Sequence, residues 1–398
     1  MSNSVRLTPA LLAAMAARFF ITFAVQVQSV LLGWQMYELN HDPYKLGLIG
    51  LIEAAPALTM ALYAGHIVDR SPPVRIYRFL IFFALISFLT AMNAHAEGVL
   101  YLAAFITGLA RSFAAPSMST IIPKIVERIH LPKAMAWTTM VNRMALVLGP
   151  VAAGVFYAWK GYTLTYGIAM ASAICSFFAT FLLPKLNPPE RVAQENLWQS
   201  LSVAVKYVFS HQLMLSVLSL DMFAVLFGGV TAILPAIAKD VLHTDSVGLG
   251  VLRAAPAVGA ILVTLFLTRF SINKNAGRSM LLCVFAFGLC IIGFAASRNF
   301  ILSCALLFVS GMVDSVSMVV RGSILQLISP DSMRGRIASV NSMFIVSSNE
   351  LGAFESGTAA GLMGLIPSIY FGGAMTLVTV AVIYLIYPKL GSLNLDDL

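Results

Sequence analysis

Long apolar runs, separated by short polar connections, dominate the pattern along the chain. Twelve runs reach the roughly 20 residues that a helix needs to cross the hydrocarbon core of a bilayer. They cover residues 9–36, 46–66, 75–95, 98–120, 135–158, 161–183, 212–236, 247–269, 279–296, 299–321, 337–362 and 366–387. The pattern predicts an all-α membrane protein with twelve transmembrane helices.

One connection is longer than the others. Residues 184–211 contain two adjacent prolines, several charges and then an amphipathic stretch. We expect a cytoplasmic linker with an amphipathic helix over 185–211. It would separate a bundle of six helices at 1–184 from a second bundle at 212–398.

The two halves repeat each other in sequence. GLIEAAPA at 50–57 matches GVLRAAPA at 250–257, and GLARS at 108–112 matches GMVDS at 311–315. Similar places in the fifth and eleventh runs are occupied by Asn142 and Asn341. A six-plus-six repeat is expected of a transporter whose halves rock about a central, pseudo-symmetric site. Chance similarity among apolar helices is the alternative.

Composition supports a membrane location. Hydrophobic residues make up 59% of the chain and charged residues 11%, whereas a soluble domain has about 25% charged residues. The net charge of +8 therefore does not indicate nucleic-acid binding. The four cysteines lie in apolar runs without CxxC spacing, so we interpret them as small buried hydrophobic residues, not as disulfides or metal ligands.

The distribution of basic residues predicts the orientation. With the N-terminus in the cytoplasm, sixteen Lys and Arg fall in cytoplasmic segments and four in outer loops. Because basic residues concentrate on the cytoplasmic side, we expect both termini there. An even number of helices agrees with this.

The loop after the second run carries a motif. It contains Gly65, Asp69 and Arg70, followed by two prolines and Arg75. Together with the repeat, this loop resembles the cytoplasmic loop motif of the major facilitator superfamily, although the second glycine of that motif is missing. The resemblance covers essentially the whole chain. It implies that Asp69 and Arg70, with Arg75, latch the two halves in an outward-open state.

Two further segments refine the resemblance. The run Gly149-Pro150-Val-Ala-Ala-Gly154 is similar to the glycine-proline motif of antiporters in this family. Small residues permit close helix approach and proline frees a backbone carbonyl, so a packing kink without bearing on transport direction is the alternative. Residues 328–337 and the eleventh run resemble the branch that includes bacterial enterobactin exporters and some drug efflux proteins.

Ten ionisable residues fall within the runs: Glu53, Asp221, Asp314, Glu350, Glu355, Arg18, Arg111, Arg143, Arg253 and Arg321. A charge at the bilayer centre costs about 2.5–3.5 kcal/mol, so these side chains must face the interior, pair or line water. At repeat-related positions the sign inverts: Glu53 corresponds to Arg253, and Arg111 to Asp314. We expect interdomain charge contacts there that change during alternating access. Fixed intramembrane pairs that orient helices are the alternative.

The eleventh run contains two acids, Glu350 and Glu355. Five residues apart on a helix, they point about 140° away from each other, so one would face the cavity and the other a neighbouring helix. In the family this helix packs against the second helix, which carries Glu53, and neighbouring buried carboxyls hold protons more readily. We expect Glu350 first, then Asp314, Glu53 and Glu355, to carry a coupling proton. A neutral acid bonded to a backbone carbonyl is the alternative.

Other residues are candidates for the substrate cavity, chiefly because the first and seventh helices line it in the family. They are Arg18, Gln26, Arg111, Asp221 and Phe223. For the charged members, pairing between helices is the alternative. For Phe223, a place in the core or against lipid is the alternative.

The resemblance implies a secondary transporter in a bacterial cytoplasmic membrane. We expect proton-coupled export of a small amphiphilic compound, a siderophore or a drug-like molecule, by a monomer. An importer of a small solute and a lipid transporter are the alternatives. The sequence has no HExxH, GxSxG, phosphate loop or Cys/His cluster, so we expect neither an enzyme nor a bound cofactor or metal. The two-half repeat favours alternating access over an open channel.

Overall fold

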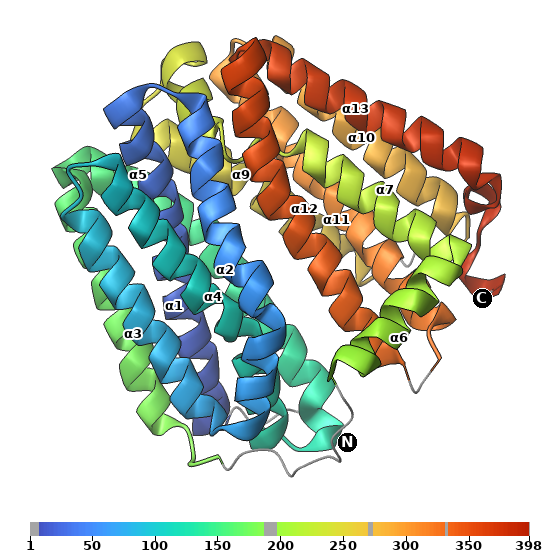
Figure 1. The fold of residues 1–398 in the computed structure, drawn as a ribbon, viewed down its shortest axis with the longest axis horizontal. Helices are drawn as coiled ribbons and strands as arrows, with labels where there is room; N and C mark the ends of the chain where they lie inside the picture. The colour runs from blue at the N-terminus through green and yellow to red at the C-terminus, as the bar shows by residue number, and fades with distance from the viewer. Residues whose placement is uncertain (1–7, 187–196, 270–273, 331–332, 398) are drawn as a thin grey trace. The chain divides into compact units, whose positions relative to one another are not determined.

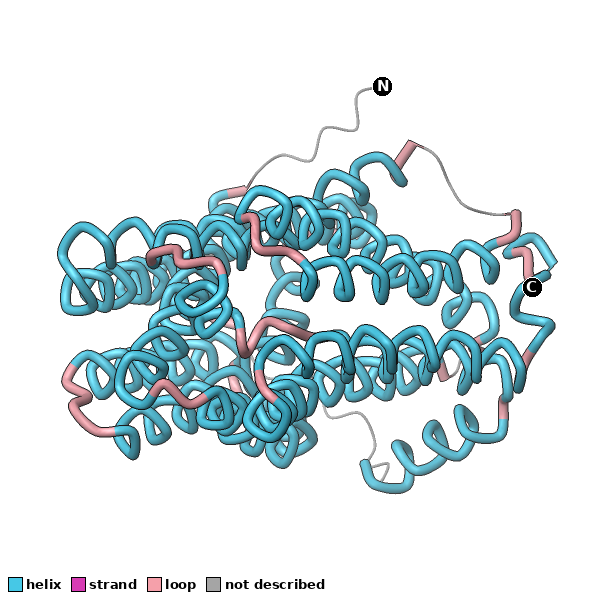
Figure 2. Tube along the Cα trace, turned by 90° about the horizontal axis from the view of Figure 1, so that it is seen from above, coloured by secondary structure: helices cyan, strands magenta, loops and turns pink. Residues whose placement is uncertain are grey.

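The fold is known from a computed structural model, which describes residues 8–186, 197–269, 274–330 and 333–397. Within these ranges the chain consists of helices joined by short loops and contains no strand (Figure 2). The prediction of an all-α fold is confirmed.

The chain groups into two compact units. Unit 1 comprises Met1–His41, Ile49–Val192 and Thr244–Ala254, and unit 2 comprises Asp42–Leu48, Ala193–His243 and Ala255–Leu398. The helices α2 and α9 contribute to both units. The predicted boundaries at 184 and 211 stay a prediction.

Unit 1 is built mainly from the first five helices, coloured blue to green in Figure 1. They are α1 (Pro9–Asn40), α2 (Pro43–Arg70), α3 (Pro73–Met92), α4 (Glu97–Ile125) and α5 (Leu131–Ala179), followed by a 3-10 turn at Thr180–Leu182. At the start of α1, the hydroxyl of Thr8 accepts a hydrogen bond from the backbone N–H of Leu11 at 3.3 Å, which satisfies one of the donors that a helix start leaves unpaired.

Unit 2 contains the remaining helices, except that residues 246–254 of α9 group with unit 1. They are α6 (Leu197–Ser210), α7 (Gln212–Gly228), α8 (Leu234–Ala236), a π-helical turn at Ile237–Val241, α9 (Ser246–Leu267), α10 (Ala276–Ala296), α11 (Phe300–Ile328), α12 (Arg334–Met363) and α13 (Leu365–Ile386). The amphipathic helix predicted in the linker corresponds to α6. The chain bends by 97° between Ser202–Ser210 and α7.

Each predicted apolar run overlaps helical structure. Among the described residues, eight helices are long and apolar enough to cross a membrane, or nine if the bent pair of α6 and α7 is one span. One of them, Leu131–Leu182, covers two predicted runs. The chain turns inside it at Lys160 and Gly161, where Gly161 has φ 69°, a backbone conformation that glycine adopts without steric cost.

The run at 212–236 is not one continuous helix. The helix α7 ends at Gly228, and the chain resumes helical structure at Leu234. Two adjacent glycines, Gly228 and Gly229, weaken a helix. Pro235 then occupies the start of α8, where its missing N–H and fixed φ are favourable.

The backbone repeats the pattern seen in the sequence. His41 (φ 52°) and His243 (φ 48°) adopt left-handed conformations 202 residues apart. Gly161 (φ 69°) and Gly364 (φ 90°) have positive φ values 203 residues apart. The same connections therefore turn in the same way in both copies of the repeat.

A buried polar network joins three helices of unit 1. Gln28 of α1 donates to the hydroxyl of Ser87 of α3 at 2.6 Å and accepts from Thr107 of α4 at 2.8 Å. Ser87 also donates to the carbonyl of Ala103 at 2.7 Å. Because buried polar groups are costly unless paired, this network favours one packing of α1, α3 and α4.

Candidate functional site

Gly108 sets the contact between α4 and α2. A Cβ at this position would collide with the backbone carbonyl oxygen of Glu53, and would lie 2.8 Å from the ring of Pro56. Arg111 follows one turn later on α4, and its Nη1 donates to Oε1 of Glu53. Glu53 is buried, whereas the side chain of Arg111 is 45% exposed. The close approach at Gly108 therefore makes an ion pair between a buried carboxylate and an arginine that reaches a more open region.

A second arginine faces the same carboxylate. Arg253 lies in the part of α9 that belongs to unit 1, and it is close enough to Glu53 for an electrostatic interaction. Its Nη1 donates to the hydroxyl of Ser29 of α1 at 3.1 Å. Glu53 therefore bonds one guanidinium group, from α4, and interacts electrostatically with a second, from α9.

The start of α9 is held by the glycine-proline motif of α5. The hydroxyl of Ser246 donates to the carbonyl of Gly154 at 3.0 Å. A Cβ on Gly250 would lie 2.5 Å from the carbonyl oxygen of Pro150. Gly149 faces α1 instead, where a Cβ would lie 2.5 Å from the Cβ of Gln26. Small residues on α5 therefore allow close packing with both α1 and α9.

A polar stripe runs along one face of α1. Arg18, Thr22, Gln26 and Ser29 follow helical spacings of four, four and three residues, which place them above one another. On α5, Oδ1 of Asn142 accepts from Nε of Arg18 at 3.3 Å and from the hydroxyl of Thr22 at 3.1 Å. The stripe ends at Ser29, which bonds Arg253.

Sequence reasoning selected Arg18 and Gln26 from this stripe but missed two of its members. Thr22 and Ser29 are common residue types in membrane helices, and Asn142 was noticed only as a mark of the repeat. The regular spacing of the four polar residues in an otherwise apolar run was the signal that could have found them.

Asp221, a predicted cavity residue, lies in a buried ion pair of unit 2. Its Oδ2 pairs with Nη1 of Arg321 on α11. Asp221 is 5% exposed and Arg321 is 2% exposed. This arrangement matches the helix-pairing alternative considered from the sequence. Phe223 points elsewhere, into a groove between α7 and α13.

The other acids of unit 2 lie on α11 and α12. Glu350 is buried, while Glu355 and Asp314 are half-buried. The helix α12 packs closely against α7 at Gly352, where a Cβ would lie 2.9 Å from the carbonyl oxygen of Leu226. The roles expected for the three acids in proton coupling stay predictions.

The predicted cytoplasmic latch lies almost wholly outside the described side chains. This applies to Gly65, Asp69 and Arg70, whereas Arg75 is exposed at the start of α3. The latch stays a prediction. The sequence predicted interdomain contacts for Arg111, and the structure gives Arg111 the partner Glu53 inside unit 1. The contact expected between Arg111 and Asp314 would join the two units, and it also stays a prediction.

The cluster of Glu53, Arg111 and Arg253, extended by Ser29 and the stripe on α1, is the candidate site. Its carboxylate is close enough to attract two guanidinium groups at once. The neighbouring hydroxyl and amide groups can form hydrogen bonds with a solute. The cluster therefore combines a buried carboxylate with groups that can bind a polar molecule.

Comparisons with known proteins agree with this architecture. Residues 14–353 match the family model of the Major Facilitator Superfamily. Relatives include enterobactin exporters EntS from Citrobacter koseri, 25% identical over 92% of this chain and 88% of that protein, and from Escherichia coli, 24% identical over 96% and 92%.

Solved structures share the fold. The nucleoside transporter NupG has a TM-score of 0.68 and 16% identity, covering 95% of this chain and 99% of that chain. A bacterial homologue of the human lysosomal transporter Spinster has a TM-score of 0.70 and 14% identity, covering 97% and 96%. At these identities the structural likeness shows the fold alone. The family match, over most of the chain, shows that this multi-pass membrane protein belongs to the Major Facilitator Superfamily of transporters.

Proposed function

We propose that this protein exports a small amphiphilic compound across a bacterial cytoplasmic membrane in exchange for protons. The observation that carries the coupling is the buried carboxylate of Glu53, which pairs with Arg111 and attracts Arg253. The relatives named as enterobactin exporters support export and an oxygen-rich, aromatic substrate.

Protonation of Glu53 is the proposed switch. An ionised Glu53 attracts both arginines, and a proton removes that attraction. Buried cations are stable only with nearby counter-charge or water, so the protonated cluster favours a more open arrangement. The ionised cluster favours a closed one.

Arg253 lies on a helix that contributes to both units, so we propose that protonation of Glu53 affects unit 2 through this helix. Residues 246–254 of α9 group with unit 1, and residues 255–267 of the same helix group with unit 2. A change in the attraction between Glu53 and Arg253 therefore acts on a helix that both units share. We propose that this is how proton binding biases alternating access.

The stripe on α1 is the proposed substrate-binding surface. Arg18 bonds Asn142 through Nε, so its other N–H groups can donate to hydroxyl or carbonyl oxygens, and the hydroxyl oxygen of Thr22 can accept a hydrogen bond. The rings of Phe19 and Phe23 stack on each other with centroids 6.0 Å apart and supply aromatic surface on the same helix. An amphiphile with oxygen-rich aromatic groups, such as a catecholate siderophore, would suit both features.

Flux in proteoliposomes tests the proposal. Enterobactin and ethidium are the probes, with a pH gradient of either direction and with a protonophore as a control for dissipation of the gradient. We expect uptake of a probe into vesicles with an acidic lumen, and loss of uptake with the protonophore. Uptake only with an acidic exterior would indicate a proton-coupled importer instead.

Glu53→Gln is the decisive variant. It keeps the size of the side chain and removes the titrating group, so we expect gradient-driven flux to fall by about tenfold or more, equivalent to ~1.4 kcal/mol. Probe binding without a gradient should persist. Glu127→Gln, which changes an exposed acid after α4, is the matched control. If Glu350→Gln abolished coupling while Glu53→Gln did not, the coupling proton would belong to Glu350.

A further inference from the structure

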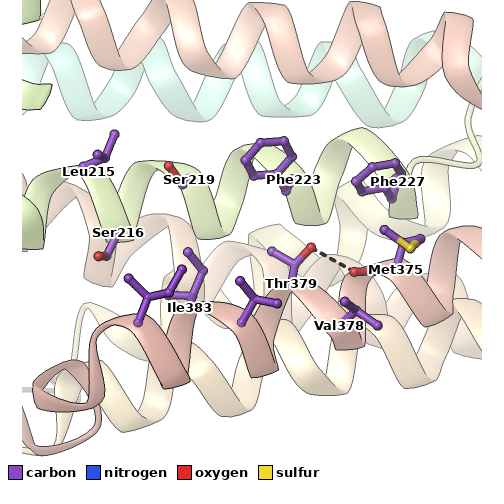
Figure 3. A pocket seen from close by; sticks show the side chains of 11 residues that line it. Leu215, Ser216, Ser219, Phe223, Phe227, Met375, Val378, Thr379 and Ile383 are labelled. Carbon is purple, nitrogen blue, oxygen red and sulfur yellow. Dashed lines mark hydrogen bonds between the residues drawn. The ribbon is translucent and has the colours of Figure 1, made fainter.

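A groove with a volume of about 450 Å³ lies between α7 and α13 in unit 2 (Figure 3). Its walls are formed by side chains from both helices: Leu215, Ser216, Ser219, Phe223 and Phe227 from α7, and Met375, Val378, Thr379, Val382, Ile383 and Ile386 from α13. No charged residue is among them. This volume falls within the range of about 300–1,000 Å³ typical of ligand sites.

The groove opens onto a surface with large exposed apolar side chains. Val378, Val382 and Ile386 are 48%, 44% and 71% exposed, and Phe223 is 37% exposed. On helices that cross a membrane, large apolar side chains exposed to this degree meet acyl chains. The groove is therefore a depression in a wall whose surroundings are hydrocarbon.

Few polar atoms line the groove, and the hydroxyl of Thr379 is bonded within its own helix. The hydroxyl of Thr379 donates to the carbonyl of Met375 within α13 at 2.8 Å (Figure 3). Ser216 and Ser219 also line the groove with small side chains. The remaining lining residues are aliphatic, aromatic or Met375, so the surface of the groove is mainly apolar.

Basic residues gather at one end of this groove. The groove reaches Leu215 near the start of α7 and Ile386 at the end of α13, and Lys389 follows three residues later. The start of α10 packs there, because a Cβ on Gly277 would collide with the carbonyl oxygen of Leu390. Lys274 and Arg278 therefore join Lys389 at this end, and all three are exposed; the acidic residues of the following tail are Asp396 and Asp397.

We propose that the groove between α7 and α13 binds an acyl chain of an anionic phospholipid, whose phosphate lies at the end marked by Lys389. Lys274, Arg278 and Lys389 are exposed at this end, and juxtamembrane Lys and Arg attract anionic headgroups. The inference is independent of the transported substrate and of the site at Glu53.

Photolabelling of the whole protein tests the proposal. The probes are phosphatidylglycerol and phosphatidylethanolamine with a diazirine on one acyl chain, each at low mole fraction in phosphatidylcholine vesicles, and the labelled peptides are mapped by mass spectrometry. We expect phosphatidylglycerol to label α7 and α13 more strongly than it labels exposed residues of α3 and α10. Even labelling of all exposed helices would overturn the proposal.

Two variants locate the chain and the headgroup. Ser219→Phe places a ring among the lining residues of the groove and should reduce labelling of α7 and α13 by about tenfold. Ala374→Phe, at an exposed position of α13 outside the lining, should leave the labelling unchanged. Lys389→Gln should remove the preference for phosphatidylglycerol over phosphatidylethanolamine. Unchanged labelling in Ser219→Phe, or displacement of the label by enterobactin, would contradict a lipid site.

Discussion

At the scale of single residues, the buried charged side chains of this protein each need a partner. An ion in hydrocarbon is costly, and two of the buried acids have arginine partners on neighbouring helices of the same unit. Glu53 pairs with Arg111, and Asp221 pairs with Arg321. The two pairs differ in exposure: Arg321 is 2% exposed, whereas the side chain of Arg111 is 45% exposed. The pair of Glu53 and Arg111 is the one to which we assign the proposed coupling, and the sealed pair suits a structural role.

Asp221→Asn should destabilise the protein. The change leaves Arg321 buried without its counter-charge, and breaking a buried pair in this way costs about 3–5 kcal/mol. Thermal unfolding in detergent measures the loss. Asp396→Asn, at an exposed position, is the control.

The double variant Asp221→Leu with Arg321→Met separates charge from packing. Replacing both partners by apolar residues of similar size is often neutral, and the pair borders apolar residues such as Leu220, Val320 and Ile324. We expect the double variant to be more stable than Asp221→Asn. A double variant as unstable as the single one would show that the polar pair itself is required.

Glycines determine how closely neighbouring helices approach each other in both halves of the protein. Gly108 allows α4 to approach α2 at Glu53 and Pro56. In the second copy of the repeat, Gly311 allows α11 to approach α9 at the carbonyl of Pro256. The motifs GLARS and GMVDS that revealed the repeat therefore mark the same type of close contact in both halves.

Gly108→Leu should separate α4 from α2 and weaken the ion pair between Arg111 and Glu53. Overpacking of this kind costs about 1–3 kcal/mol, so both the melting temperature and gradient-driven flux should fall. Gly98→Leu is the matched control on the same helix, because nothing lies within 4 Å of a Cβ at that position. Equal effects of the two changes would contradict the role given to Gly108.

The repeat predicts a parallel result in unit 2. Gly311→Leu should destabilise the protein, whereas Gly322→Leu on the same helix should not, since a Cβ on Gly322 also meets nothing within 4 Å. The comparison uses melting temperatures in detergent. A harmless Gly311→Leu would show that only the first copy depends on the close contact.

At the scale of the whole molecule, two compact units share the helices α2 and α9. The first residues of α2 group with unit 2, and the first residues of α9 group with unit 1. Each shared helix contains a proline, Pro56 or Pro256, at equivalent positions of the repeat. A proline leaves one carbonyl without its helical partner, so both shared helices have a local weak point near their charged residue.

The orientation in the membrane is a prediction of the whole chain. Because basic residues favour the cytoplasmic side, a cysteine placed at Lys160 should react with a membrane-impermeant maleimide added outside intact cells. A cysteine at Lys274 should react only after the cells are opened. Both positions are exposed, and the background would lack Cys175, Cys283, Cys290 and Cys304. The opposite labelling pattern would invert the proposed topology.

The sequence by itself determined the helical fold, the approximate helix positions, the repeat and the family. Hydrocarbon requires each spanning segment to be long, apolar and internally hydrogen-bonded, and such a segment is visible in one dimension. The internal break in the run at 212–236 was missed because its causes, Gly228, Gly229 and Pro235, are individually tolerated in membrane helices.

Only the tertiary structure decided which side chains meet. The sequence identified the buried ions but suggested partners at repeat-related positions, Glu53 with Arg253 and Arg111 with Asp314. The structure adds a pair that the sequence did not suggest, Glu53 with Arg111, because Gly108 removes the steric barrier between α2 and α4. Arg253 also acts electrostatically on Glu53, and the contact of Arg111 with Asp314 stays a prediction. Pairing depends on distances between helices far apart in the chain, and periodicity along one helix contains no information about those distances.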